Sequence, residues 1–167
     1  TPPDLGATTH PDLVAAVVGH CLDAGAASVT VTDHPVNSPA SVFTITGIGD
    51  AAKTAGARLL VPTQQDFQRF SLVGATRIRD FPLMVDALLA ADRVIGVCPV
   101  KDHAISGASM AVKNWYGLLG GRRNLLHQDI HQVLAELARM VRPTLVVLDG
   151  TAPMMRNGPT GGSMSDL

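Results

Sequence analysis

The chain has 167 residues and a mass of 17.4 kDa, a length typical of one domain. Hydrophobic residues make up 46% of the chain and charged residues 16%, a composition that excludes disorder as its main state. The formal net charge is −1 and aromatic residues make up 4%, so a nucleic-acid-binding protein is not expected. No apolar run approaches the ~18 residues that a membrane-spanning helix needs.

Predicted helices and strands alternate in the first half of the chain. Apolar residues recur on one helical face over residues 11–25, where Pro11 suits the first turn. A short β-branched strand is expected over 28–32. A weaker helix over 40–56, broken near its glycines, and a second short strand over 58–61 follow it.

The second half continues the alternation after one hairpin. The hairpin is expected from the runs 70–73 and 76–79, which flank Gly74 and Ala75. The other predicted elements are a helix over 82–91, a strand over 93–97, helices over 107–119 and 127–141, and a strand over 144–148. Pro99 and the pair Asp149-Gly150 are expected to end the two strands.

This order predicts an α/β fold with a mostly parallel sheet and helices on both of its faces. The arrangement is Rossmann-like and three-layered, with one antiparallel hairpin. Residues 1–167 are expected to form a single domain. Because the chain starts at Thr1 and ends just after the glycine-rich run 157–162, we expect it to be truncated at both ends. Localisation, cytoplasmic or exported, stays open.

Polar residues follow three of the predicted strands. Asp33 comes after the strand over 28–32, the segment 98–103 after the strand over 93–97, and Asp149 after the strand over 144–148. Ligands of open α/β sheets bind outside the carboxyl ends of the strands, so these residues are expected to meet. Asp33 and Asp149 then either bind a ligand or a divalent metal, or cap the turn that follows. Cys98 is either a nucleophile or ligand, or a small buried hydrophobic residue, the reading we favour.

The region 99–123 is the most unusual part of the chain. It contains five basic residues and one acidic residue: Lys101, Asp102, His103, Lys113, Arg122 and Arg123. This pattern predicts a pocket for phosphate or carboxylate, to which Asn114 adds a hydrogen bond; the alternative is a solvated basic face. His103 is either a general acid or base, or a metal ligand, or a residue that fixes its loop by hydrogen bonding.

Three weaker signals complete the candidate residues. Gly161, in the glycine-rich run, is compatible with an anion-binding nest and equally with a simple turn. His127 and His131 are four residues apart, but residue 128 is Gln where a zincin motif has Glu, so a surface or partly buried pair is expected. Tyr116 is expected to pack in the core or to line the site.

Several motifs resemble the family of domain of unknown function 362. The central motif is Pro99-Val-Lys101-Asp-His103, followed by Ser106-Gly107, Ala111-Val-Lys113-Asn114 and Gly117. The others are Thr9-His10-Pro11, Asp33-His34, Gly121-Arg-Arg123 with His127, Asp149-Gly150 and Asn157-Gly-Pro-Thr-Gly-Gly162. They follow one another in the order that this resemblance implies and span nearly the whole chain.

The resemblance brings two expectations about cofactors. Some members of that family carry a ferredoxin-type module with clustered cysteines, which implies an iron–sulfur association. This chain has only Cys21 and Cys98 and no such cysteine motif. A more distant similarity is to the nickel-pincer lactate racemase group, which makes Lys101, His103 and Lys113 candidates for contact with a cofactor or substrate.

Two functions follow from these observations. The first is an enzyme domain acting on a small anionic substrate or cofactor. Its anion-binding residues would be Lys101, Lys113, Asn114, Arg122, Arg123 and Gly161, its proton carrier His103, and its orienting or metal-binding acids Asp33 and Asp149. The second is a non-catalytic partner module of an iron–sulfur redox protein, completed by a ferredoxin-type module elsewhere in the full protein.

Overall fold

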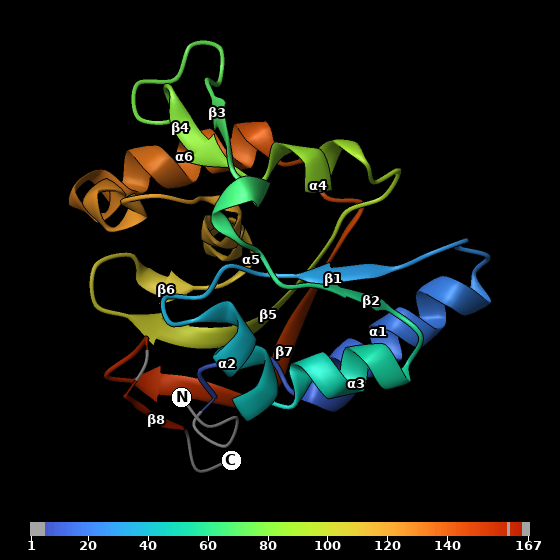
Figure 1. Cartoon of the computed structure of the whole chain (residues 1–167). Helices are drawn as coiled ribbons and strands as arrows, with labels where there is room; N and C mark the ends of the chain where they lie inside the picture. Colours follow the sequence, from blue (N-terminus) through green and yellow to red (C-terminus); the bar gives the residue numbers. More distant parts are fainter. Residues whose placement is uncertain (1–5, 160, 165–167) are drawn as a thin grey trace.

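The computed structural model describes residues 6–159 and 161–164 (Figure 1). Its first part contains three helices and two short strands: α1 (Pro11–Asp23), β1 (Thr30–Thr32), α2 (Pro39–Ile45), α3 (Ile48–Thr54) and β2 (Arg58–Leu60). The His10 imidazole accepts the Asp12 N–H at 3.3 Å and so caps α1. β1 and β2 pair in parallel, as the alternation predicted.

The middle of the chain differs from the predicted hairpin. β3 (Gln68–Phe70) pairs antiparallel with β4 (Phe81–Leu83), so the predicted strands within 71–79 lie in the loop between them. This part also holds the 3-10 helix η2 (Gln64–Asp66) and the short helix α4 (Val85–Leu89). Glu136 of the helix α6 (Ile130–Met140) is buried and accepts three backbone N–H groups of this loop, which a hairpin would have paired across its own strands.

The last part forms the larger sheet. Its elements are β5 (Ile95–His103), β6 (Gly107–Ser109), α5 (Ala111–Asn114), η3 (Trp115–Leu118), η4 (Arg123–Asp129), α6 (Ile130–Met140), β7 (Leu145–Arg156) and β8 (Ser163–Met164). The strand order is β6-β5-β7-β8. β5 and β7 are parallel, whereas β6 and β8 are antiparallel to their neighbours.

The fold is therefore mixed α/β with small sheets of mixed strand direction, rather than the mostly parallel, Rossmann-like sheet that the sequence predicts. The sheets are small, and two of the three contain antiparallel pairs. Both central strands run past their predicted ends: β5 passes through Pro99, where the pairing with β7 shifts register, and β7 passes through Asp149. Such a shift accommodates a residue that has no N–H to donate. The segment 107–109, predicted as the start of a helix, instead pairs with 101–103.

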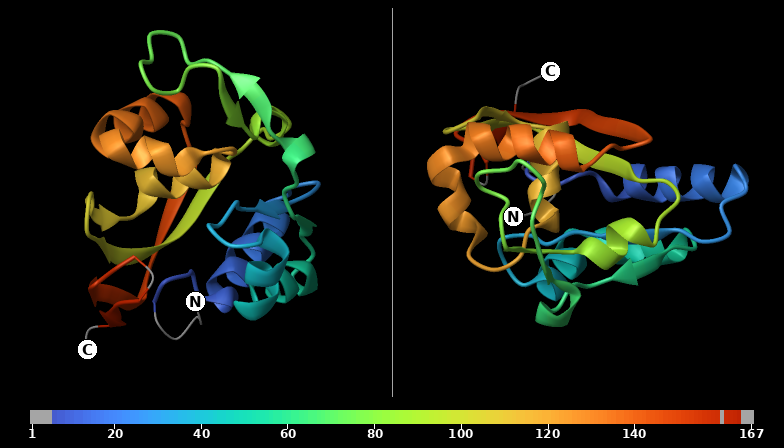
Figure 2. Two further views of the ribbon diagram at one scale, coloured as in Figure 1. Left: turned by 60° about the vertical axis from the view of Figure 1, so that its left-hand side comes forward. Right: turned by 90° about the horizontal axis from the view of Figure 1, so that it is seen from above.

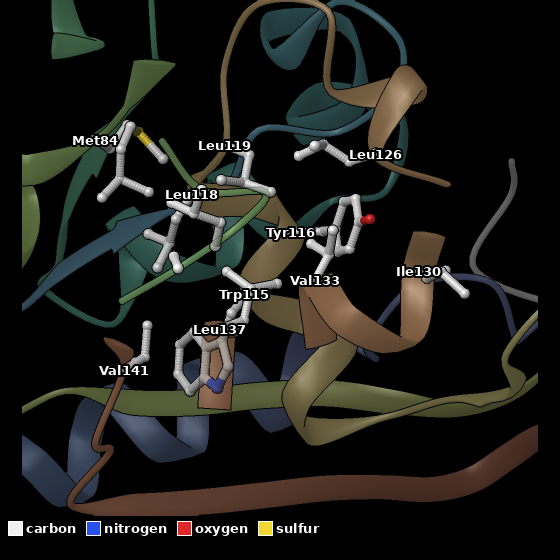
Figure 3. Close-up of a cluster of buried hydrophobic side chains, with 13 residues drawn as sticks. Met84, Trp115, Tyr116, Leu118, Leu119, Leu126, Ile130, Val133, Leu137 and Val141 are labelled. Carbon is white, nitrogen blue, oxygen red and sulfur yellow. The ribbon is translucent and has the colours of Figure 1, made fainter. Parts of the chain in front are cut away.

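Two separate apolar clusters form the core. The smaller one joins α1 and α3 through Val14, Val18, Ala52 and Ala57. The larger one surrounds α6, η3 and β4 (Figure 3). The first group of helices lies to one side of the molecule, and α6 with the larger sheet lies to the other, in both Figure 1 and the left view of Figure 2.

Trp115 connects the larger cluster to the sheet. A Cβ on Gly96 of β5 would stand 2.9 Å from the indole ring, so glycine is the residue that lets the indole approach the strand this closely. The neighbouring Tyr116 lies at the edge of the cluster, with its hydroxyl turned away from Leu118 and Leu119 (Figure 3).

Within the described residues, no helix is both long and apolar enough to cross a membrane.

Candidate functional site

Basic residues from three parts of the chain gather at the end of β5. We call Lys101, His103, Lys113, Arg123 and His127 the basic cluster. Lys101 and His103 come from β5, Lys113 from α5, and Arg123 and His127 from η4. They interact electrostatically: Lys113 lowers the pKa of both histidines, and Lys101 and Arg123 add to the effect of burial in lowering the pKa of Lys113.

Lys101 is anchored at its tip. Its Nζ donates a hydrogen bond to the carbonyl of Ala7 at 2.8 Å, and two of its three protons stay available. Burial lowers the pKa of Lys101, while the nearby Asp33 and Cys98 favour its charged form. The lysine therefore ties the segment before α1 to β5 and still presents charge to the cluster.

Lys113 carries the least compensated charge of the cluster. Burial first, then Lys101 and Arg123, lowers the pKa of Lys113 to about 8. Its Nζ lies 5.0 Å from the centre of the Tyr116 ring, a cation–π contact that offsets part of the lost hydration. An anion beside Lys113 would relieve the repulsion between these cations.

His103 is 4% exposed and neutral at physiological pH. Burial, together with Lys113, His127 and Lys101, lowers the pKa of His103 to about 4. Its Nδ1 accepts the N–H groups of Ile105 at 3.3 Å and Ser106 at 3.2 Å. The ring proton is therefore on Nε2, which makes His103 a neutral donor at that atom.

His127 joins His103 to Tyr116. Its ring stacks on His103 with centroids 6.0 Å apart and contacts Tyr116 at 4.9 Å. Burial and Lys113 lower the pKa of His127, while the backbone carbonyl of Arg123 acts in the opposite direction. His131, its predicted partner on the helix, is exposed.

Asp33 supplies a carboxylate beside the cluster. Although Asp33 keeps contact with solvent, surrounding protein atoms displace enough water to raise its pKa; Arg123, the His34 N–H and Lys101 act in the opposite direction. Its Oδ1 accepts the His34 N–H at 2.9 Å. The same oxygen lies against Gly117, where a Cβ would stand 1.9 Å from it, so this approach requires glycine.

Asp149 has a structural role in this arrangement. It is 5% exposed and accepts the His10 N–H at 2.7 Å, the Thr151 N–H at 3.0 Å and the Thr151 hydroxyl at 2.6 Å. These bonds hold the start of α1 against β7. They lower the pKa of Asp149 in spite of its desolvation. Asp149 does not cap a following turn, because β7 continues past it, and a ligand-binding role stays a prediction.

Three other predicted site residues lie outside the cluster. Asn114 donates to the Val97 carbonyl at 3.4 Å and so fastens α5 to β5. Arg122 is exposed before η4, and no hydrogen bond or ion pair within the described chain joins it to the cluster. Gly161 is exposed, with no heavy atom within 4 Å of an added Cβ. Its neighbour Gly158 instead donates to Asp102 at 3.1 Å.

The metal-ligating side chains are dispersed. Among residues 6–159 and 161–164, no group of three or more His, Cys, Asp or Glu residues is placed to hold a metal ion. Cys98 is 1% exposed, and burial raises the pKa of its thiol to about 11, as expected for a small buried residue.

Two hollows of about 180 and 220 Å³ lie away from the basic cluster. The first is against α2 and α3, and the second is against β2 and α4.

The sequence alone did not place His127 and Tyr116 beside the other residues of the site. Residue 127 follows Arg123 by four positions, a spacing that places two side chains on one helical face. That spacing joins His127 to the basic region, whereas the sequence-based prediction paired His127 with His131. Tyr116 follows Lys113 by three positions, which is the same signal.

Comparison with curated proteins and with solved structures gives no match. The family model described as Domain of unknown function (DUF362) matches residues 1–167, in agreement with the motifs around Lys101, His103 and Lys113. The chain therefore belongs to the DUF362 family.

Proposed function

We propose that this chain is an enzyme domain that binds a small anionic substrate or cofactor, phosphate or carboxylate, in the basic cluster. The observation that carries the proposal is the grouping of Lys101, Lys113 and Arg123, all partly buried, around two histidines. Asp33 is the acid that acts most directly on them. Partly buried cations that outnumber their counter-charges are costly unless an anion joins them.

Partial burial also bears on the size of the ligand. A surface that docks an acidic protein projects its lysines and arginines into solvent, where they steer association. Lys101, Lys113 and Arg123 are half-buried instead, and the Arg123 Nη1 is engaged with the Tyr116 carbonyl at 2.8 Å. This favours a small anion over a ferredoxin-type partner, the alternative function.

His103 takes a narrower role than the proton transfer expected from the sequence. Because its Nδ1 accepts two N–H groups, the ring offers an N–H at Nε2 and is uncharged at neutral pH. A neutral imidazole can donate a hydrogen bond to a developing negative charge while it keeps its proton. We propose Lys101 and Lys113 as the charges that hold the anion and His103 as the donor to its reacting end.

Anion binding to the wild type and two single variants tests the proposal. Thermal unfolding is measured with sulfate, phosphate and acetate for the wild type, Lys113→Met and Lys53→Met. Lys53 is the matched control, because it is the one lysine of the sequence outside the basic cluster and is exposed on α3. An anion at 100 times its Kd stabilises by about 2.7 kcal/mol, which for a chain of this size is roughly 5–10 °C in Tm.

The wild type and Lys53→Met are expected to show this shift, and Lys113→Met to bind at least about tenfold more weakly, the loss of one charge-assisted hydrogen bond. Equal anion affinity in Lys113→Met would refute the proposal. No shift with any small anion, together with salt-sensitive docking to an acidic ferredoxin, would establish the partner-module function instead.

A further inference from the structure

Tyr116 carries a hydroxyl without a hydrogen-bond partner. The residue is 6% exposed, and its Oη is buried and unpaired within the described chain. A buried hydroxyl without a partner destabilises the folded protein, and native proteins keep few of them. Replacement by phenylalanine would remove that cost with almost no change in packing, so the hydroxyl calls for a function.

The position of this hydroxyl relates it to the basic cluster. The Tyr116 ring lies under the Lys113 ammonium and against the His127 ring. Arg123 acts electrostatically on the hydroxyl, and the oxygen is turned away from Leu118 and Leu119 (Figure 3). Burial raises the pKa of Tyr116 to about 12, so the group stays a neutral O–H that can both donate and accept.

We propose that the Tyr116 hydroxyl binds a neutral oxygen of the ligand, so that the ligand is a small anion that also carries a hydroxyl or carbonyl group. The inference rests on the proposed anion site and adds the substrate class and a further binding residue to it. The anionic group is matched by the charged donors Lys101, Lys113 and Arg123. The neutral Tyr116 hydroxyl beside these cations complements an uncharged oxygen of the ligand next to its anionic group. The buried Nδ1 of His127 is also without a hydrogen-bond partner in the described chain, and the His127 ring contacts the Tyr116 ring at 4.9 Å.

Matched ligand pairs test this assignment. The probes are acetate against glycolate, and ethyl phosphate against 2-hydroxyethyl phosphate, so each pair differs by one hydroxyl and the two pairs separate carboxylate from phosphate. Affinities are measured by calorimetry for the wild type and Tyr116→Phe, with urea unfolding of both free proteins. The wild type is expected to prefer the hydroxylated member of at least one pair by about tenfold, and Tyr116→Phe to lose that preference.

The stability measurement distinguishes a binding role from a structural one. If the hydroxyl serves a ligand, free Tyr116→Phe unfolds at the same or a higher urea concentration than the wild type. A less stable variant with unchanged ligand preference would overturn the inference, as would an equal loss of affinity for both members of each pair. If neither acetate nor ethyl phosphate binds the wild type, the anion site itself fails; if both bind without a hydroxyl preference, only the Tyr116 assignment fails.

Discussion

Glu136 is expected to be the strongest single polar anchor of the fold, and Glu136→Gln tests it. Its carboxylate is 0% exposed and accepts the backbone N–H groups of Thr76 at 2.7 Å, Arg77 at 3.1 Å and Ile78 at 2.7 Å. The Gln132 amide donates to it at 2.9 Å, and the Thr76 hydroxyl adds a longer bond. The glutamate thus replaces strand pairing for the loop 71–80.

The magnitude follows from the ionisation of this carboxylate. Desolvation raises its pKa, but the hydrogen bonds outweigh that effect and bring the pKa of Glu136 to about 2, from an ordinary 4.5. Lowering the pKa from 4.5 to about 2 corresponds to at most about 3.4 kcal/mol of stability. We expect Glu136→Gln to lose about 2–3 kcal/mol at pH 7, because the amide N–H₂ faces backbone donors.

Urea unfolding at pH 7 and pH 3 is the assay. A lowered folded-state pKa stabilises the protein above the unfolded pKa of about 4.5, and this contribution falls as the pH approaches 2. The gap between wild type and Glu136→Gln should therefore shrink by more than half at pH 3. Asp129→Asn is the control: Asp129 pairs with the same Arg77 at 2.8 Å but is exposed, so its loss should be below about 1 kcal/mol. A Gln variant as stable as the wild type at pH 7, or a gap that does not change with pH, would refute this account.

Two further predictions concern the site. Sulfate keeps its charge across neutral pH, so its affinity should fall as the pH rises through about 8, where Lys113 loses its proton. This pH dependence should vanish in Lys113→Met. Calorimetry from pH 6.5 to 9 measures the affinity, and a wild-type affinity that does not change with pH counts against Lys113 as a residue that binds the anion. Gly117→Ala should destabilise by about 1–3 kcal/mol because its Cβ would meet the Asp33 carboxylate, and in an Asp33→Ala background the same change should cost much less. Additive losses in this double-mutant cycle would show that the clash is not the cause.

The residues of the cluster were more predictable than the sheet that carries them. Lys101, His103, Lys113 and Arg123 come from one continuous region, so local spacing was enough to group them. The same holds for the short parallel strands β1 and β2, whose β-branched and aliphatic runs are local signals.

Long-range pairing explains what the sequence did not show. Pro99 and Asp149 looked like strand ends, yet β5 and β7 support each other past both positions through a shift in register. Gly107 starts a strand with φ +75°, because residues 107–109 find partners in 101–103 that local helix periodicity cannot reveal. The loop 71–80 depends on Glu136, about 60 residues away.

The position of the charged residues between the two apolar clusters has a consequence for motion. Asp33 follows β1, whose sheet shares no strand with the sheet of Lys101 among the described residues, and Ala7, which accepts from Lys101, precedes α1. A junction made of charges and a few hydrogen bonds admits water more readily than an apolar one, so each cluster can open as its own cooperative unit. An anion bound at this junction would then stabilise both parts of the fold at once. It would slow amide hydrogen exchange in α1 and in α6 together, although the buried residues of these helices do not contact the anion.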